Sequence, residues 1–381
     1  MRKAQAFSPD YATARHRFRQ AASRAGWSLE AHPIGVAGPT GDELTVDVAC
    51  SPIQDTDKSL VVSSGLHGVE GFLGSAVQIE LLEEWDSRSA SPVRCVFLHG
   101  LNPYGFAWIR RVDEHNVDPN RNFLLPQERY EGSPEGSAGL DGLLNPQCPP
   151  SWREPFALKA LWAVARHGMP ALRQAAAAGQ YDFPRGLFFG GTGPSRTHQL
   201  LGENLERWLR GSRDVVHLDF HTGLGPSGAC KLMIDYPLST RQRKRLTDWF
   251  GTDSFEESES GNTAYNVRGG LGRWCVARNL APDYLFAFAE FGTYGLMQVL
   301  AGLRAENQAQ HWGTPTAAST VRAKHRLREL FCPSAEAWRL QVLDHSFDLV
   351  ARAVRGLAGS PSSHVGPVTA EQPAAPDRGG S

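Results

Sequence analysis

Residues 60–71 read LVVSSGLHGVEG, and the rest of the chain can be understood from this stretch. A short apolar run from Leu60 leads into small residues, and His67 and Glu70 follow just before a segment with helical spacing, 72–85. This order predicts a buried strand, a tight turn and a helix. It also places an imidazole and a carboxylate at one turn, where both could bind a divalent metal. Alone the pair is weak evidence, because Glu70 would also favour the start of a helix.

Further segments on either side extend this order into an α/β pattern. Helical spacing is found at 11–26, 72–85, 197–210, 239–250, 295–304 and 318–355. Strand-like runs are found at 28–33, 43–49, 60–64, 93–98, 214–220, 231–234 and 284–289. We therefore expect one α/β domain, residues 1–357, with a mixed, mostly parallel central sheet flanked by helices. The Ser-, Pro-, Ala- and Gly-rich residues 358–381 are expected to form a disordered tail.

Composition argues against several classes of protein. The chain has 381 residues, with 39 basic and 40 acidic side chains, so nothing favours nucleic acid or an anionic membrane as a partner. No apolar run has the length of a membrane span, and the first residues lack the apolar core of a signal peptide, so a cytoplasmic protein is the default expectation. The six cysteines form no Cys-x-x-Cys pair, and no glycine-rich phosphate motif follows a strand. Sulfur-ligated zinc, a disulfide framework and nucleotide chemistry are therefore disfavoured.

Two more residues with metal or acid–base chemistry follow other predicted strands. His221 and Glu290 each come directly after a strand-like run. The carboxyl ends of parallel strands meet at one edge of an open α/β sheet, where ligands bind. The close pair His67 and Glu70 together with the distant His221 therefore forms a candidate three-ligand metal site. Glu290 is the candidate general base beside it, and a carboxylate that caps a loop or pairs with an arginine is the alternative.

Three arginines, Arg110, Arg111 and Arg121, lie in a polar loop that follows another strand-like run. A guanidinium can hold a substrate carboxylate through two hydrogen bonds, or polarise a carbonyl and stabilise the oxyanion that forms on attack. A solvated basic surface is the alternative. The sequence Asn120-Arg121-Asn122 among turn-forming residues favours a positioned loop.

Five short motifs, taken together and in order, resemble the signature of the zinc carboxypeptidase superfamily. They are His67-Gly-Val-Glu70, Asn102-Pro-Tyr-Gly, Asp118-Pro-Asn-Arg-Asn-Phe123, Asp219-Phe-His221-Thr222-Gly223 and Phe288-Ala-Glu290. The chain is similar to a bacterial branch of unknown function in that superfamily. Its DFHTG motif resembles the aspartoacylase and succinylglutamate desuccinylase branch, because digestive carboxypeptidases usually carry a serine after the third ligand. The resemblance implies a zinc carboxypeptidase-like fold.

The resemblance also implies the roles of the metal-site residues. His67, Glu70 and His221 would bind one zinc ion per chain, and Glu290 would be the general base. Asp219 lies two residues before His221 on the same strand face, so it could orient that ligand from behind. A structural carboxylate is the alternative at this position.

Substrate contacts follow from the same resemblance. Arg121 and Asn120 would hold a substrate carboxylate, and Arg111 would polarise the scissile carbonyl. The choice of Arg111 over Arg110 stays open, because the loop between these arginines and Arg121 differs in length from the branches it resembles. Tyr265 is similar to a mobile tyrosine that closes over substrate, and an exposed loop tyrosine is the alternative.

These residues predict a zinc-dependent hydrolase that cleaves an amide bond next to a free carboxylate, as a carboxypeptidase-like metallopeptidase does. An N-acyl amino acid deacylase of the aspartoacylase or succinylglutamate desuccinylase type is the alternative within enzymes. A ligand-binding module without catalysis is the alternative of another class. Either enzyme would act on a small peptide or an N-acyl amino acid. The oligomeric state stays open.

Overall fold

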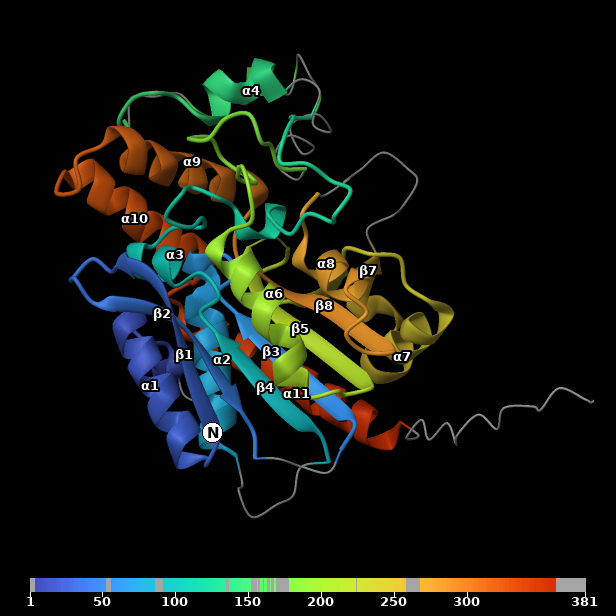
Figure 1. The fold of residues 1–381 in the computed structure, drawn as a ribbon. Helices are drawn as coiled ribbons and strands as arrows, with labels where there is room; N and C mark the ends of the chain where they lie inside the picture. Colours follow the sequence, from blue (N-terminus) through green and yellow to red (C-terminus); the bar gives the residue numbers. More distant parts are fainter. Residues whose placement is uncertain are drawn as a thin grey trace, which may run out of the picture.

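The computed structural model describes residues 4–52, 56–85, 92–134, 137–151, 178–223, 225–257 and 268–360, with isolated positions between 156 and 168. Its strands are β1 (Ser28–Ala37), β2 (Glu43–Cys50), β3 (Lys58–Ser64), β4 (Arg94–His99), β5 (Asp214–Gly223), β6 (Cys230–Ile234), β7 (Phe255–Glu257) and β8 (Asp283–Gly292). They form one eight-stranded sheet in the order β1-β2-β4-β3-β5-β8-β6-β7 (Figure 1).

The centre of the sheet is parallel and its flanks are mixed. The strands β4, β3, β5 and β8 run parallel to one another. By contrast, β2 is antiparallel to both of its neighbours, and β6 is antiparallel to β8 and parallel to β7. Every residue of β3, β4 and β5 is buried, as expected of parallel strands that are covered on both faces. The predicted α/β fold with a mostly parallel central sheet is confirmed.

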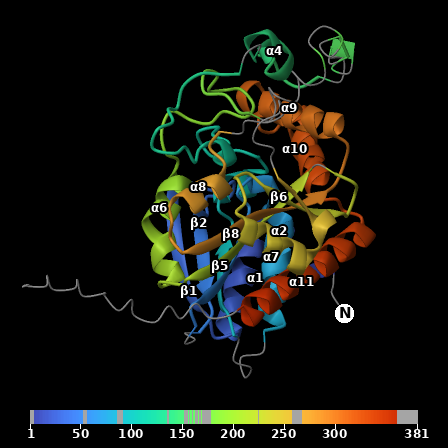
Figure 2. The same ribbon diagram turned by 90° about the vertical axis from the view of Figure 1, so that its right-hand side faces the viewer.

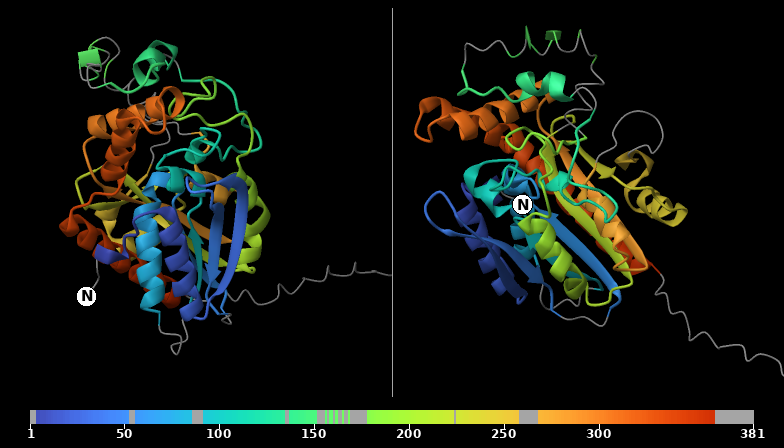
Figure 3. Two further views of the ribbon diagram at one scale, coloured as in Figure 1. Left: turned by 90° about the vertical axis from the view of Figure 1, so that its left-hand side faces the viewer. Right: turned by 45° about the horizontal axis from the view of Figure 1, so that its top comes forward.

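Helices cover both faces of this sheet (Figures 1 and 2). One face carries α1 (Tyr11–Arg24), α2 (Gly71–Glu83), α7 (Thr240–Phe250) and α11 (Glu336–Gly359). The other face carries α6 (Arg196–Leu209) and α8 (Leu271–Ala277). Beyond one end of the sheet lie α3 (Pro103–Trp108), α4 (Ser137–Leu144), α9 (Leu296–Trp312) and α10 (Ala318–Phe331), as Figure 3 also shows. Among the described residues, no helix combines the length and the apolar character needed to cross a membrane.

Two boundaries differ from the sequence prediction for local reasons. β5 continues to Gly223 and β8 to Gly292, so His221 and Glu290 lie within strands and not after them. The two residues are partners in the parallel pairing of these strands. The predicted strands ended where the apolar side chains end, but backbone pairing continues beyond that point and leaves no signal in the side-chain pattern.

The stretch 318–355, predicted to be helical, is helical except for a short break. It is divided between α10 and α11, which leaves Cys332 and Pro333 in the connection. Proline has no backbone N–H and disfavours a helical conformation in the residue before it, and Cys332 is non-helical with φ −141° and ψ 79°. α11 ends at Gly359, two residues beyond the predicted domain boundary. Residues 361–381, on which most of the predicted tail falls, lie outside the described residues.

The turn after β3 depends on two glycines. Gly65 has φ +68° and lets the chain leave the strand. Gly68 begins the short 3₁₀ helix η2 (Gly68–Glu70), which packs against α3. A Cβ at Gly68 would lie 2.1 Å from the carbonyl carbon of Gly105, so a larger residue would push η2 away from α3. The close packing of η2 fixes where His67 and Glu70 stand at the carboxyl end of the parallel strands.

Candidate metal centre

A close pair of residues and a third that is distant in the sequence meet at the carboxyl end of the parallel strands. His67 directly precedes η2, Glu70 ends it, and His221 lies near the end of β5. All three are buried, and one potential ligand atom of each lies within 4.8 Å of those of the other two. The structure thus brings together the three residues that the sequence proposed as metal ligands.

Both imidazoles direct Nδ1 toward the Glu70 carboxylate. His67 Nδ1 lies 2.9 Å from Oε1, and His221 Nδ1 lies 3.0 Å from Oε2. The other nitrogen of His221, Nε2, lies 2.6 Å from Oδ2 of Asp219. Because an ionised carboxylate only accepts hydrogen bonds, Nε2 carries a proton and a neutral His221 would turn the lone pair of Nδ1 toward Glu70. The lone pair of Nδ1 and the negatively charged Glu70 carboxylate would repel each other, and a proton or a cation between them removes this repulsion. Two imidazoles with one carboxylate suit a divalent cation such as zinc.

A proton on His221 can take this place. Burial lowers the pKa of His221, but the carboxylates of Asp219 and Glu70 outweigh it and raise that pKa well above its usual value. Burial raises the pKa of Glu70, but His67 and His221 outweigh it and hold that pKa well below its usual value. The cluster therefore pairs a carboxylate with an imidazolium, and a metal ion would bind there in exchange for a proton.

Two buried aspartates lie against the imidazole nitrogens that do not face Glu70. Asp219 bonds His221, as described above, and Asp118 Oδ1 lies 3.0 Å from His67 Nε2. Burial raises the pKa of Asp118, but Arg111 and His67 outweigh it and hold that pKa well below its usual value. Carboxylates in this position fix the ring orientation of metal-binding histidines. The sequence indicated such a role for Asp219 but missed Asp118, whose only signal was its place at the start of the Asp-Pro-Asn-Arg motif.

A chain of hydrogen bonds continues from Asp219 through the sheet. Oδ1 of Asp219 accepts from the Ser63 hydroxyl at 2.6 Å, Ser63 Oγ lies 2.8 Å from His217 Nε2, and His217 Nδ1 lies 2.9 Å from the Tyr284 hydroxyl. Since Ser63 gives its one hydrogen to Asp219, His217 Nε2–H donates to Ser63 and Tyr284 donates to His217. Burial lowers the pKa of His217 to about 4, which keeps its ring neutral. No local sequence signal marks Ser63 or Tyr284, because strand register sets these contacts.

The two adjacent arginines point to different places. Arg111 Nη2 lies 2.7 Å from His67 Nε2, and Nη1 lies 3.4 Å from Oε1 of Glu70. Arg110 is buried, and its Nε donates to Oε1 of Glu306 on α9 at 2.9 Å. The structure therefore brings Arg111 to the metal-ligand cluster, whereas Arg110 is engaged in an ion pair with α9.

Asn120 and Arg121 lie on the 3₁₀ helix η3 (Pro119–Arg121), directly after Asp118. Oδ1 of Asn120 accepts from the backbone N–H of Leu271 at 3.0 Å, and Nη1 of Arg121 donates to the Asn120 carbonyl at 2.7 Å. Nε of Arg121 is buried without a hydrogen-bond partner in the described part of the chain. Burial lowers the pKa of this guanidinium. A buried and incompletely bonded guanidinium is suited to binding an anion.

Glu290 lies on β8 opposite His221 on β5. It is half-buried, and a Cβ at Gly223 would lie 3.3 Å from its Oε1. Burial lowers the pKa of Arg111, but nearby negative charges outweigh burial and raise this pKa above its usual value. The charge of Glu290 is one of them. Glu290 is therefore within electrostatic reach of the metal-ligand cluster. Tyr265, the remaining residue that the sequence singled out, lies outside the described residues.

Comparison with known proteins identifies the family. The family model described as "Protein of unknown function (DUF2817)" matches residues 7–345. The chain belongs to the DUF2817 family. This agrees with the branch of unknown function that the motifs resemble. No curated protein matches the sequence.

Solved structures similar to this DUF2817 chain include a candidate metallopeptidase, a carboxypeptidase and an aspartoacylase family protein. A candidate metallopeptidase from Shewanella amazonensis SB2B is 18% identical, with 85% of this chain and 94% of that chain covered and a TM-score of 0.41. Carboxypeptidase A from Helicoverpa armigera is 12% identical, with 85% and 74% covered and a TM-score of 0.44. An aspartoacylase family protein from Mesorhizobium loti is 16% identical, with 76% and 68% covered and a TM-score of 0.36.

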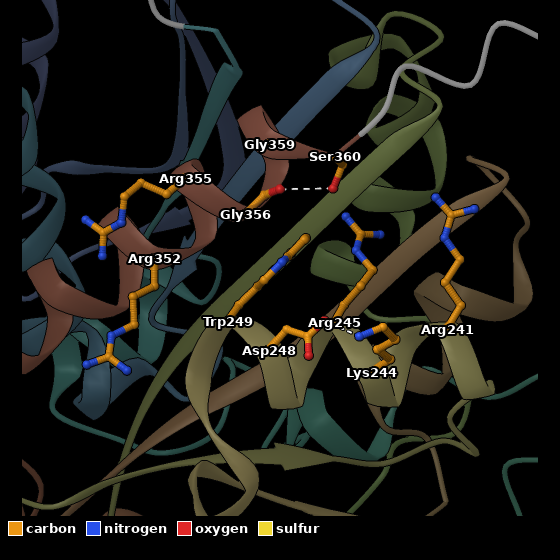
Figure 4. Close-up of a pocket in the computed structure, with 10 residues that line it drawn as sticks. All are labelled: Arg241, Lys244, Arg245, Asp248, Trp249, Arg352, Arg355, Gly356, Gly359 and Ser360. Atoms are coloured by element: carbon orange, nitrogen blue, oxygen red, sulfur yellow. Dashed lines mark hydrogen bonds and ion pairs between the residues drawn. The ribbon is translucent and has the colours of Figure 1, made fainter.

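A separate hollow of about 800 Å³ lies between α7 and the C-terminal end of α11 in this DUF2817 chain (Figure 4). Although several arginines line it, Arg245 is paired with Asp214 at 2.6 Å and with Asp283 at 2.7 Å. Asp214 and Asp283 are the first residues of β5 and β8. The hollow therefore lies at the amino end of the parallel strands, opposite the metal-ligand cluster.

Proposed function

We propose that this chain is a zinc-dependent hydrolase that cleaves an amide bond next to a free carboxylate. The observation that carries the proposal is the convergence of two imidazole Nδ1 atoms on the Glu70 carboxylate, with an aspartate behind each ring. Two histidines and one glutamate form a known ligand set of catalytic zinc. When bound, zinc would polarise the scissile carbonyl and lower the pKa of a water molecule toward neutrality.

The acid–base work in this proposal belongs to Glu290. It pairs with His221 across adjacent parallel strands, so its carboxylate can take a proton from a water molecule near the cluster and pass it to the leaving amine. Arg111 bonds Asp118 through Nε at 2.9 Å and presents its terminal nitrogens to the cluster. These donors would stabilise the oxyanion that forms when the carbonyl is attacked.

Substrate recognition in this proposal belongs to η3. Arg121 and Asn120 would hold the free carboxylate of a small peptide or an N-acyl amino acid, and the unbonded Nε of Arg121 supports this role. An N-acyl amino acid deacylase is the second candidate, favoured by the threonine in the DFHTG motif that ends in Thr222-Gly223.

Metal analysis and two variants test the proposal. Purified protein should contain about one zinc per chain, as a single three-ligand site requires. His67→Ala should lose the metal, whereas Glu290→Gln should keep it and lose about 100-fold or more in turnover, as expected for a general base. A His67→Ala protein with full zinc content would remove His67 from the site, and an active Glu290→Gln protein would dismiss Glu290 as the base.

A substrate panel separates the candidate functions. The zinc-loaded protein is assayed against peptides that differ at the C-terminus and against N-acyl amino acids. Hydrolysis confined to N-acyl amino acids would replace the peptidase with the deacylase. If no member of either panel were cleaved, and Glu290→Gln bound the same compounds as the unmodified protein, a ligand-binding module would be favoured.

A further inference from the structure

One phenylalanine beside Arg111 has a backbone conformation that bulky residues rarely adopt. Phe188 lies in the left-handed region with φ +59°, and it is buried. Glycine takes this conformation freely and stands nearby at Gly186 and Gly190, whereas a residue with a large side chain is strained there. Such strain persists only where the surrounding structure enforces it, and it is concentrated at functional sites.

The loop 180–190 enforces this conformation through hydrogen bonds of Gln180. The backbone N–H of Gln180 donates to the Phe188 carbonyl at 3.0 Å, and the Gln180 carbonyl accepts from the N–H of Gly190 at 2.8 Å. Nε2 of the same side chain donates to the Leu187 carbonyl at 3.2 Å. The backbone on both sides of Phe188 is therefore held in place.

The same loop contacts two residues of the proposed active site. The carbonyl of Phe189 accepts from the backbone N–H of Asp118 at 2.7 Å. The guanidinium carbon of Arg111 lies over the Phe188 ring, 5.8 Å from its centroid. An aromatic face attracts a guanidinium electrostatically and restricts its orientation. Since Asp118 holds only Nε of Arg111, at 2.9 Å, the ring supplies a second contact to this side chain.

Packing explains the burial of Phe188 but not its backbone. The residue belongs to an apolar cluster that also includes Val69 of η2 and Leu327 of α10. A large apolar side chain on a relaxed backbone would fill that cluster as well, so packing does not require the left-handed conformation. The strained backbone directs this ring to the guanidinium of Arg111.

We propose that Phe188 is a positioning residue for Arg111, whose terminal nitrogens it keeps turned toward His67 and Glu70. The inference rests on the hydrolase function, in which these nitrogens stabilise the oxyanion. The backbone of Arg111 is already fixed, because its carbonyl accepts the N–H of Gly68 at 3.2 Å. The ring thus acts on the guanidinium, and its effect falls on the chemical step and not on substrate binding.

Kinetics of Phe188→Leu test this role on the zinc-loaded enzyme, with an amide that the unmodified enzyme cleaves. Leucine keeps an apolar side chain but offers no aromatic face to Arg111. We expect kcat to fall about 10-fold with KM unchanged, because the oxyanion exists only after attack on the carbonyl. In the Arg111→Ala background, the same substitution should lower kcat less than about 2-fold, because no guanidinium remains to be positioned.

Phe183→Leu is the matched control. Phe183 is half-buried in the same loop, and its ring contacts no guanidinium within the described residues, so kcat should stay unchanged. A measurement by NMR needs neither turnover nor a Phe188 variant. In the unmodified protein, the N–H resonances of the Arg111 guanidinium should be shifted upfield by the ring, and they are assigned by their loss in Arg111→Ala.

Three results would overturn the role of Phe188. They are an unchanged kcat in a folded Phe188→Leu protein, an equal fall of kcat in the Arg111→Ala background, and guanidinium resonances of Arg111 without an upfield shift. An upfield shift in a protein that cleaves no amide would keep Phe188 in contact with Arg111 and count against the hydrolase.

Discussion

Replacing Asp219 with asparagine should weaken metal binding while leaving the fold in place. Asp219 is fully buried, and its two oxygens accept from His221 Nε2 and from Ser63 Oγ, each at 2.6 Å. Asparagine has the same shape but presents one acceptor and one donor. With its NH₂ toward His221, it favours the tautomer that carries the proton on Nδ1, which cannot bind a metal. With its carbonyl toward His221, every hydrogen bond from Ser63 through His217 to Tyr284 has to reverse.

The size of the effect follows from the position of Asp219. Groups that orient a metal-binding histidine are typically worth 10–100-fold in metal affinity, or about 1.4–2.8 kcal/mol. A short, charge-assisted and fully buried contact belongs at the upper end of that range. We therefore expect Asp219→Asn to weaken zinc binding by about 100-fold.

Chelator competition measures this difference, and thermal unfolding of the metal-free proteins reports whether the fold persists. Asp47→Asn is the matched control, because Asp47 on β2 is also fully buried but accepts from Arg19 and Thr45. It should lower stability and leave zinc affinity unchanged. Wild-type zinc affinity in Asp219→Asn, or equal losses of affinity in the two variants, would refute the reasoning.

Two further predictions concern stability. Arg110→Leu should lower the free energy of unfolding by about 3 kcal/mol, because the buried Glu306 carboxylate would keep Lys324 but lose its guanidinium partner; an unchanged urea midpoint would contradict this ion pair. The metal-free protein should lose stability as pH falls from about 6.5 toward 4, because burial lowers the pKa of His99 to about 4 and the unfolded chain then binds the proton first. His99→Phe keeps an aromatic ring on Phe18 and should reduce the difference between urea unfolding at pH 7 and at pH 5, and an undiminished difference would exclude His99 as its source.

Local signals were enough to predict the elements that build the metal centre. The apolar runs of β3 and β5 are visible as strands, and His67 and Glu70 stand in a glycine-flanked turn before a helix. The rule that parallel strands bind ligands at their carboxyl ends then added His221 from another strand. Where the prediction failed, at the ends of β5 and β8, the missing information was backbone pairing, which side-chain patterns do not record.

The sequence by itself determined the α/β class and the set of residue types available for metal chemistry, because hydrophobic periodicity and turn residues are local properties of the chain. Only the tertiary structure decided that Arg111 and not Arg110 faces the cluster, and that Asp118 bonds the Nε2 side of His67. Each of these outcomes depends on the direction of a side chain relative to elements distant in the sequence. Strand register and the packing of loops on helices set that direction, and neither is encoded in the spacing of neighbouring residues.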